Sequence, residues 1–276
     1  MTALLGLITA VSWAFSNLFT HQLSRLKIEQ TVVMAGIIGV ATLALVPVAI
    51  VVDYGNVTFT VENLAWPVLG GVFSVFGLLT LVRALSVGSL SVVAPIIALE
   101  GGIAVVMSVA LGERPSLLQY ALMATAVIGA MVVSLEPGRH TAAGAIPAVL
   151  SAIGFAAAWV SIGMSDLPSL TTVAVTRGTG FVIVFALVLV FAKQRVPPRA
   201  SIVPFLACGL LDALGYVTFG LATAVGSIAV ASVAATQWTT AAAIIGITIL
   251  RERLRPIQYA GIVVTLVSVS ALVIAS

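Results

Sequence analysis

The chain has 276 residues, of which 61% are hydrophobic and only 8% are charged. Soluble domains carry about 25% charged residues, so this composition excludes a soluble globular protein and indicates that lipid is the solvent. The formal net charge of +3 comes from short loops between apolar runs, which makes a nucleic-acid-binding surface a poor interpretation. The single cysteine, Cys208, lies within an apolar run. Neither a disulfide framework nor a cysteine-rich metal site is therefore expected.

Ten apolar runs are long enough to cross a hydrocarbon core of about 30 Å as helices, which takes about 20 residues. The runs lack a two-residue alternation, so helices are favoured over strands. The expected spans are 3–20, 30–52, 64–85, 89–111, 117–135, 143–164, 169–192, 202–223, 227–249 and 255–275. The first run is full length and no cationic segment precedes it, which indicates a mature helix rather than a cleaved signal peptide.

The sequence contains two related halves. The segment ALSVGSLSVVAP at 84–95 recurs as ATAVGSIAVASV at 222–233, an offset of 138 residues. A Glu-Arg pair followed four residues later by Gln-Tyr-Ala occurs at 113–121 and again at 252–260, an offset of 139. Each half has five expected spans, an odd number, so the second half enters the membrane the other way up.

This duplication predicts the fold. We expect an all-α integral membrane protein with ten transmembrane helices, arranged as two inverted five-helix repeats around a central cavity. The first repeat is expected at residues 1–138 and the second, inverted repeat at 139–276. Inverted repeats of this kind are typical of transporters, whose binding site lies near the bilayer midplane between the halves.

The duplicated motifs also carry a resemblance. Gly112-Glu113-Arg114 after the fourth span, Arg251-Glu252-Arg253 after the ninth and the ten-span duplication resemble the drug/metabolite transporter superfamily, EamA type. The resemblance implies that spans 1, 3, 4, 6, 8 and 9 surround a central cavity and that spans 5 and 10 lie at the periphery. It also implies export of amino acids, other metabolites or drugs. Where this family often has proline in the ninth span, the chain has Val233, opposite Pro95, so the resemblance does not extend to a matching proline bend.

Three ionisable residues fall inside expected spans: Glu100 in the fourth, Arg177 in the seventh and Asp212 in the eighth. The helical rise of 1.5 Å per residue puts all three near the midplane. A charge there costs about 2.5–3.5 kcal/mol or more, so such residues face the interior and pair. Two carboxylates and one guanidinium leave one carboxylate over, which can hold a proton or a cationic substrate group. The alternative is a buried ion pair that only fixes helix packing.

Polar and aromatic residues at similar depth complete the expected substrate- or proton-binding site. They are Gln237, Trp238, Trp13, Asn17 and Tyr216. An aromatic face can stack on a cation and an amide can orient a polar group, although the two tryptophans can equally pack against core or lipid. Trp66 and Trp159 are nearer the ends of their spans, which favours the interfacial aromatic belt for both.

The sequence also lacks several signatures. It has no ATP-binding loop motif, no serine–histidine–aspartate set and no metal-ligand pattern around His21 or His140. We therefore expect no cofactor, no metal and no enzyme activity.

The expected function is secondary active transport by alternating access. Specifically, we expect proton-coupled export of a small amphipathic metabolite such as an amino acid or organic cation. An uncoupled facilitator or exchanger is the alternative, and an intramembrane lipid-handling protein or enzyme is a remote one.

Basic residues are distributed unevenly between the loops. Those at the loops after spans 1, 3, 5, 7 and 9 are Arg25, Lys27, Arg83, Arg139, Lys193, Arg195, Arg199, Arg251, Arg253 and Arg255, against Arg114 alone at the other loops. Because Lys and Arg in short loops stay cytoplasmic, this bias puts both termini outside the cytoplasm, whereas the resemblance implies cytoplasmic termini.

We expect a multi-pass protein of the plasma (inner) membrane, a monomer or weak homodimer. Its expected partners are the lipid bilayer, a small-molecule substrate and protons, with no nucleic acid.

Overall fold

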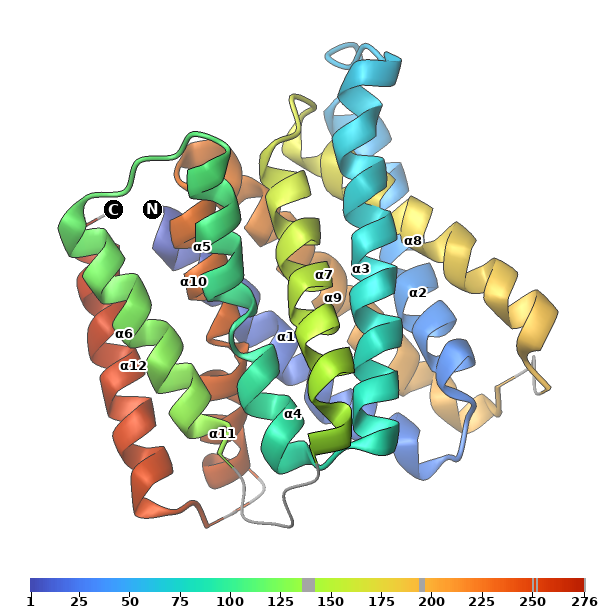
Figure 1. Cartoon of the computed structure of the whole chain (residues 1–276). Coiled ribbons are helices and arrows are strands. Elements are labelled where there is room, and N and C mark those ends of the chain that lie inside the picture. Colours follow the sequence, from blue (N-terminus) through green and yellow to red (C-terminus); the bar gives the residue numbers. More distant parts are fainter. Residues whose placement is uncertain (136–141, 194–196, 250, 252, 276) are drawn as a thin grey trace.

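The structure, a computed structural model, describes residues 1–135, 142–193, 197–249, 251 and 253–275. Regular structure in these residues is entirely helical (Figure 1). The helices are α1 (Thr2–Arg25), α2 (Gln30–Val52), α3 (Val61–Val87), α4 (Leu90–Ile97), α5 (Glu100–Ala110), α6 (Leu117–Val133), α7 (Ala145–Gly163), α8 (Ser169–Phe191), α9 (Ile202–Val225), α10 (Ile228–Thr236), α11 (Trp238–Thr248) and α12 (Pro256–Ala275), with short 3-10 turns at Ala142–Gly144 and Arg199–Ser201.

The lengths and apolar character of these helices fit a multi-pass membrane protein, as the composition predicts. Within the described residues, nine helical segments are long and apolar enough to cross a bilayer. The one expected span outside this set is the fifth, α6, which is apolar but has only 17 residues. Most expected boundaries agree with the helices to within a few residues, and α2 begins and ends where the hydropathy predicts. The main difference in length is α1, which continues to Arg25 instead of ending near residue 20.

Two expected spans are each divided into two helices, which corrects the prediction of uninterrupted helices at 89–111 and 227–249. The first is divided between Ile97 and Glu100, where the Leu99 amide donates to the Ile96 carbonyl, three residues back rather than four. The second is divided at Gln237, whose backbone amide donates to the Ala234 carbonyl, again three residues back. Pro95 precedes the first division and removes a backbone donor, but no proline precedes the second. A local tightening of the helix to three-residue hydrogen bonding is therefore sufficient for the interruption.

The helices pack in pairs that join the two halves of the sequence. Helix α1 packs along α9, α3 along α7, α2 along α8 and α6 along α12. Figure 1 shows α6 and α12 side by side at one edge of the bundle, the peripheral place expected for spans 5 and 10. Helices α3 and α7 approach closely where Gly154 meets Gly77, since a Cβ atom on Gly154 would lie 2.8 Å from the Gly77 Cα. Small residues allow this close approach in a membrane, where packing rather than water drives helix association.

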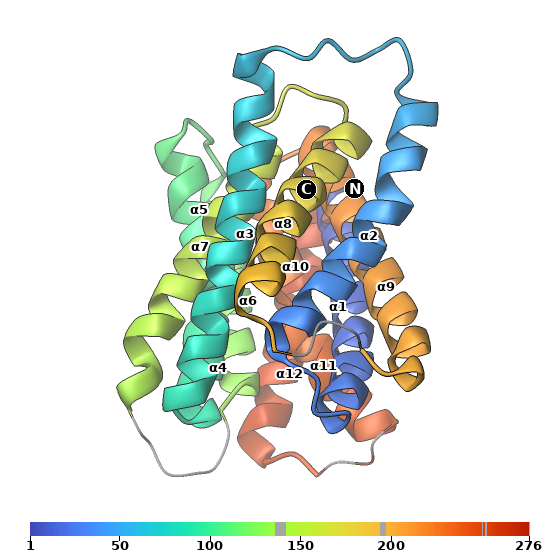
Figure 2. The same ribbon diagram turned by 90° about the vertical axis from the view of Figure 1, so that its right-hand side faces the viewer.

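The two ends of the bundle differ (Figures 1 and 2). One end, here called the terminal face, carries both termini and the α2–α3, α5–α6, α7–α8 and α9–α10 connections. The opposite end, here called the basic face, carries the α1–α2, α3–α4, α8–α9 and α11–α12 connections. The boundary proposed between residues 138 and 139 lies outside the described residues, and so does Glu252.

At the terminal face, Glu113 ties the α5–α6 connection to the start of α10. Its carboxylate accepts hydrogen bonds from the Ile228 amide at 2.5 Å, the Ala229 amide at 3.0 Å and the Ser227 hydroxyl at 3.0 Å. A carboxylate is favourable there because the first amides of a helix have no partner within it and carry partial positive charge. Glu113 therefore caps the start of α10.

Candidate functional site

A cavity of about 250 Å³ lies between the helices, here called the central cavity. Its lining comes from α1, α2, α3, α4, α5, α7, α8, α9 and α11. Helices α6 and α12 contribute nothing, as the resemblance implies, whereas α2 and α8 line the cavity in addition to the expected helices. The cavity extends to the basic face, because its lining includes the exposed Gln30, the first residue of α2.

One side of the cavity holds an ion pair between α8 and α9. The Arg177 Nε donates to Asp212 Oδ2 at 2.9 Å, and Nη2 donates to the same oxygen. The remaining Arg177 nitrogen, Nη1, donates to the Ser74 hydroxyl at 3.3 Å, and that hydroxyl is hydrogen-bonded to the Tyr216 hydroxyl at 3.2 Å. The guanidinium carbon also lies 3.8 Å above the centre of the Tyr216 ring. The buried cation is thus held by one carboxylate, one hydroxyl and one aromatic face.

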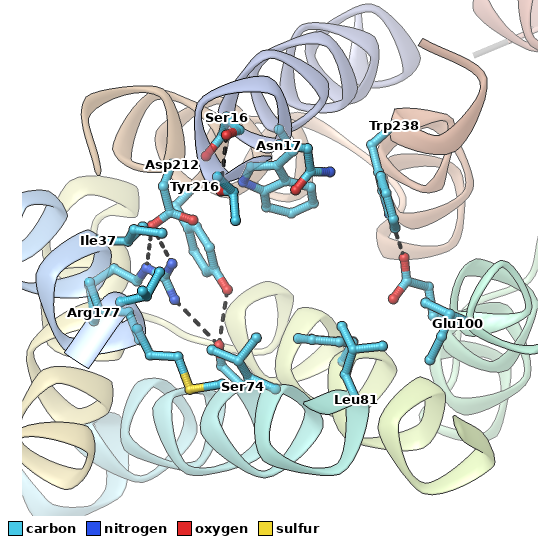
Figure 3. Close-up of a pocket in the computed structure, with 18 of the residues that line it drawn as sticks. Ser16, Asn17, Ile37, Ser74, Leu81, Glu100, Arg177, Asp212, Tyr216 and Trp238 are labelled. Carbon is cyan, nitrogen blue, oxygen red and sulfur yellow. Dashed lines mark hydrogen bonds and ion pairs between the residues drawn. The ribbon is translucent and has the colours of Figure 1, made fainter. Parts of the chain in front are cut away.

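Glu100 lies on the other side of the cavity, across from this network (Figure 3). Its side chain accepts one hydrogen bond, from the Trp238 indole nitrogen to Oε1 at 2.9 Å, and among the described residues no cation pairs with it. Glu100 is only 2% exposed. It is the first residue of α5 and Trp238 is the first of α11, so both stand at the divisions of the interrupted spans. The positive end of α5 stabilises a carboxylate at that position.

Aromatic rings close the cavity toward the terminal face. Trp13 stacks on Trp159 with ring centres 5.7 Å apart and meets Tyr216 edge-on at 5.5 Å. Trp159 in turn packs on Phe219 with centres 5.6 Å apart, and these rings continue into the buried core around Ile228. The prediction that Trp159 belongs to an interfacial belt is wrong, because α7 turns this side chain into the bundle, where it is 3% exposed.

Seven of the eight residues predicted for the site line the central cavity. They are Glu100, Asp212, Arg177, Trp238, Trp13, Asn17 and Tyr216. The eighth, Gln237, is buried among helices: its amide nitrogen donates to the Val233 carbonyl at 2.9 Å and its oxygen accepts from Thr240 at 3.4 Å. The structure therefore uses Gln237 at the division between α10 and α11 and does not bring it to the cavity.

The sequence interpretation overlooked Ser74, which bridges Arg177 and Tyr216. A neutral serine carries little signal in an apolar run, but the repeat offers one: Ser74 and Asp212 are separated by the repeat offset of 138 residues. As for metals, the described part of the chain contains no group of three or more His, Cys, Asp or Glu side chains that could hold an ion.

A bundle of apolar helices around a cavity with buried charges fits a multi-pass membrane protein of the transporter type. The sequence model of the EamA-like transporter family matches residues 1–135 and 142–274. The chain therefore belongs to the EamA-like transporter family, within the drug/metabolite transporter superfamily. Proteins of this family are transporters and not enzymes.

Comparison with solved structures supports the same fold. A chain titled "Crystal structure of protein", one of 29 solved chains that match, has a TM-score of 0.82 at 13% sequence identity. The match covers 99% of this chain and 96% of that one. At this identity the likeness shows the fold alone. No curated protein matches the chain.

Proposed function

We propose that the protein is a secondary active transporter of the plasma membrane that exports a small amphipathic metabolite, such as an amino acid or an organic cation, in exchange for protons. The observation that carries this proposal is Glu100, a carboxylate at the cavity wall whose charge no described cation balances. Buried ionisable groups inside membrane helices mark substrate and proton pathways. The same carboxylate can then take a proton or a cationic substrate, but not both at once.

We further propose that residues 1–138 and 139–276 form two inverted repeats that rock around the cavity. Several contacts support this arrangement because they recur when the halves are exchanged. Trp13 occupies the space beside Gly215, and Ser151, its repeat equivalent, donates to the carbonyl of Gly77, the equivalent of Gly215, at 2.7 Å. The Glu100–Trp238 hydrogen bond itself joins two residues separated by 138 positions, the repeat offset. Transporters with inverted repeats bind substrate at the interface of the halves.

The transport mechanism is tested in liposomes that contain the purified protein. A pH gradient that is acidic inside should drive uptake of a substrate, and Glu100→Gln should abolish that response because the amide cannot exchange a proton. Glu62→Gln, which alters an exposed carboxylate in the first turn of α3, is the matched control and should keep the response. Unchanged coupling in Glu100→Gln would remove the proton-exchange mechanism while leaving transport itself in place.

An uncoupled facilitator or exchanger is the second candidate function. It is favoured by the hydrogen bond from Trp238, because a carboxylate that already has a donor can serve as a binding group without exchanging protons. Such a protein would transport without a pH gradient and would be accelerated by unlabelled substrate on the opposite side. The same liposomes distinguish the two mechanisms.

The distribution of basic residues supports both termini lying outside the cytoplasm. The connections at the basic face, with the helix ends next to them, include Arg25, Lys27, Arg83, Lys193, Arg199, Arg251, Arg253 and Arg255. Short-loop Lys and Arg are retained on the cytoplasmic side, which makes the basic face cytoplasmic and the terminal face external. A peptide tag at the N-terminus should therefore be accessible to an impermeant probe in intact cells. Labelling only after permeabilisation would reverse this orientation.

A further inference from the structure

We propose that the central cavity selects a monovalent cation with a flat or apolar body, with Glu100 as its counter-ion, and discriminates against zwitterions and anions. This inference rests on the proposed transport function and narrows its substrate class. It follows from three properties of the cavity: the existing partners of Arg177, which is the one cation among the described lining residues, the balance of charges and the chemistry of the walls.

The first property is that Arg177 is already occupied. All three guanidinium nitrogens donate to described groups, two of them to Asp212 and one to Ser74, and one face of the guanidinium lies on the Tyr216 ring. A substrate carboxylate would have to compete with the Asp212 carboxylate and the Ser74 hydroxyl for this guanidinium, whose charge Asp212 already balances. Displacement of Asp212 would leave that residue charged and without a partner inside the membrane, which is strongly unfavourable. The guanidinium is therefore a poor receptor for an anion or for the carboxylate of an amino acid.

The second property is the charge balance. Among the described residues, the charged groups that line the cavity are Glu100, Asp212 and Arg177, which together carry one net negative charge when both acids are ionised. A bound monovalent cation neutralises the cavity. A zwitterion leaves the net charge unchanged and brings a further carboxylate into a cavity that already carries net negative charge, while an anion raises the negative charge further. Electrostatic interactions in a poorly solvated site are strong, so this difference controls selection.

The third property is the wall next to Glu100. Trp238 donates to one carboxylate oxygen, which fixes the orientation of the group, and no described residue donates to the other oxygen. The wall also includes the rings of Trp13 and Trp159, the apolar side chains of Leu78, Leu81 and Ile97, and the polar side chains of Ser16, Asn17, Thr20 and Gln30. Aromatic faces attract cations and stack on flat rings. A cavity of about 250 Å³ is below the roughly 300–1,000 Å³ of drug-sized pockets, which favours a one-ring molecule.

Protons are expected to compete with the cation for Glu100. Helices α4, α7, α10 and α11 around Glu100 carry no titratable side chain, and α6 contributes only Tyr120 in its first turn. The titratable and charged groups that face Glu100 across the cavity are Arg177, Asp212 and Tyr216. Protonation of Glu100 removes the negative charge that the cation needs, so cation binding should weaken as the pH falls.

The test measures binding of four one-ring probes to the purified full-length protein by titration calorimetry. The probes are 2-phenylethylamine as the cation, phenylalanine as the zwitterion, 3-phenylpropionate as the anion and 2-phenylethanol as the neutral molecule. We expect the amine to bind about tenfold or more tightly than each of the others near pH 7.5, a difference of one decade in Kd. Its affinity should fall as the pH is lowered, whereas that of 2-phenylethanol should not.

Two variants make the result specific to the cavity. Glu100→Gln should remove the preference for the amine, and Glu113→Gln, which alters the carboxylate at the start of α10, should retain it. If Glu100→Gln does not fold, the pH dependence of the wild-type preference tests the same point. Equal or tighter binding of phenylalanine or 3-phenylpropionate, absence of binding by all four probes, or a preference independent of both pH and Glu100 would overturn the inference.

Failure of this inference is distinguishable from failure of the proposed function. Selective binding of 2-phenylethylamine without its movement into liposomes would support the site and refute transport. Movement of a zwitterion or an anion, with no preference for the amine, would support transport and refute the cation site.

Discussion

Arg177→Met is expected to destabilise the protein by about 3–5 kcal/mol, the usual effect of breaking a buried ion pair by removing one partner. The reason is the environment of Asp212, which is 9% exposed and has Arg177 as its only hydrogen-bond partner among the described residues. Without the guanidinium, its carboxylate remains inside the bundle without a donor. Reversible unfolding of the purified protein in mixed micelles measures the change in free energy.

Two further variants separate the ion pair from general packing. Arg177→Met combined with Asp212→Leu should recover most of the lost stability, because a buried pair replaced by apolar groups of similar volume is often nearly neutral. Arg83→Met removes a basic residue that is exposed near the end of α3, and it should change stability by less than about 1 kcal/mol. If Arg177→Met were no less stable than Arg83→Met, the pair would not hold α8 to α9.

The sequence was sufficient to predict the transmembrane helices because the bilayer strongly constrains the backbone conformation. A backbone in lipid must satisfy its own hydrogen bonds, so each long apolar run becomes a helix, and α2 was predicted at both ends. The divisions of the fourth and ninth spans left no such signal. They alter a single turn, preserve the apolar character of the run and occur with a preceding proline in one case and without one in the other.

The candidate site was predictable at the positions where a charged side chain costs free energy in lipid. Glu100, Asp212 and Arg177 were identified for that reason, but the sequence did not say which acid pairs with the arginine. That choice depends on how far each helix is rotated about its axis, and a rotation of this kind changes no hydropathy. The structure pairs Arg177 with Asp212 and leaves Glu100 to Trp238.

Ser74 and Trp159 show the opposite case. A serine costs little free energy in a membrane helix, so Ser74 gives no hydropathy signal. Its one signal in the sequence is its position as the repeat equivalent of Asp212. Trp159 was assigned to the interface from its distance to the end of the span, although depth along a helix says nothing about which way the side chain faces. Its stacking on Trp13 depends on packing of α7 in the interior, which only the tertiary structure gives.

A disulfide across the terminal face is expected to stop transport. Gly163 at the end of α7 meets Ile228 at the start of α10: a Cβ atom on Gly163 would lie 2.5 Å from the Ile228 Cγ1 atom. Gly163→Cys with Ile228→Cys, in a chain that also carries Cys208→Ser, therefore places two thiols within reach of each other. Oxidation should reduce substrate flux in liposomes to background, and a reductant should restore it.

The physical reason lies in where the cavity is closed. The central cavity extends to the basic face through Gln30, whereas Trp13, Trp159 and the core around Ile228 separate it from the terminal face. Alternating access requires that separation to open in every cycle. A covalent link between α7 and α10 therefore holds the protein in the state that is open to the basic face. Binding from the basic face should persist in the oxidised protein, which distinguishes a locked transporter from an unfolded one.

Each single-cysteine variant, treated with the same oxidant, controls for the substitutions themselves and should transport with and without oxidation. Undiminished flux through the fully cross-linked protein would show that α7 and α10 stay together throughout the cycle. Because α7 and α10 both belong to the second proposed repeat, opening of the terminal face would then have to occur between other helices. Because the link acts on backbone separation and leaves Glu100, Asp212 and Arg177 unaltered, the result tests the motion independently of the chemistry in the cavity.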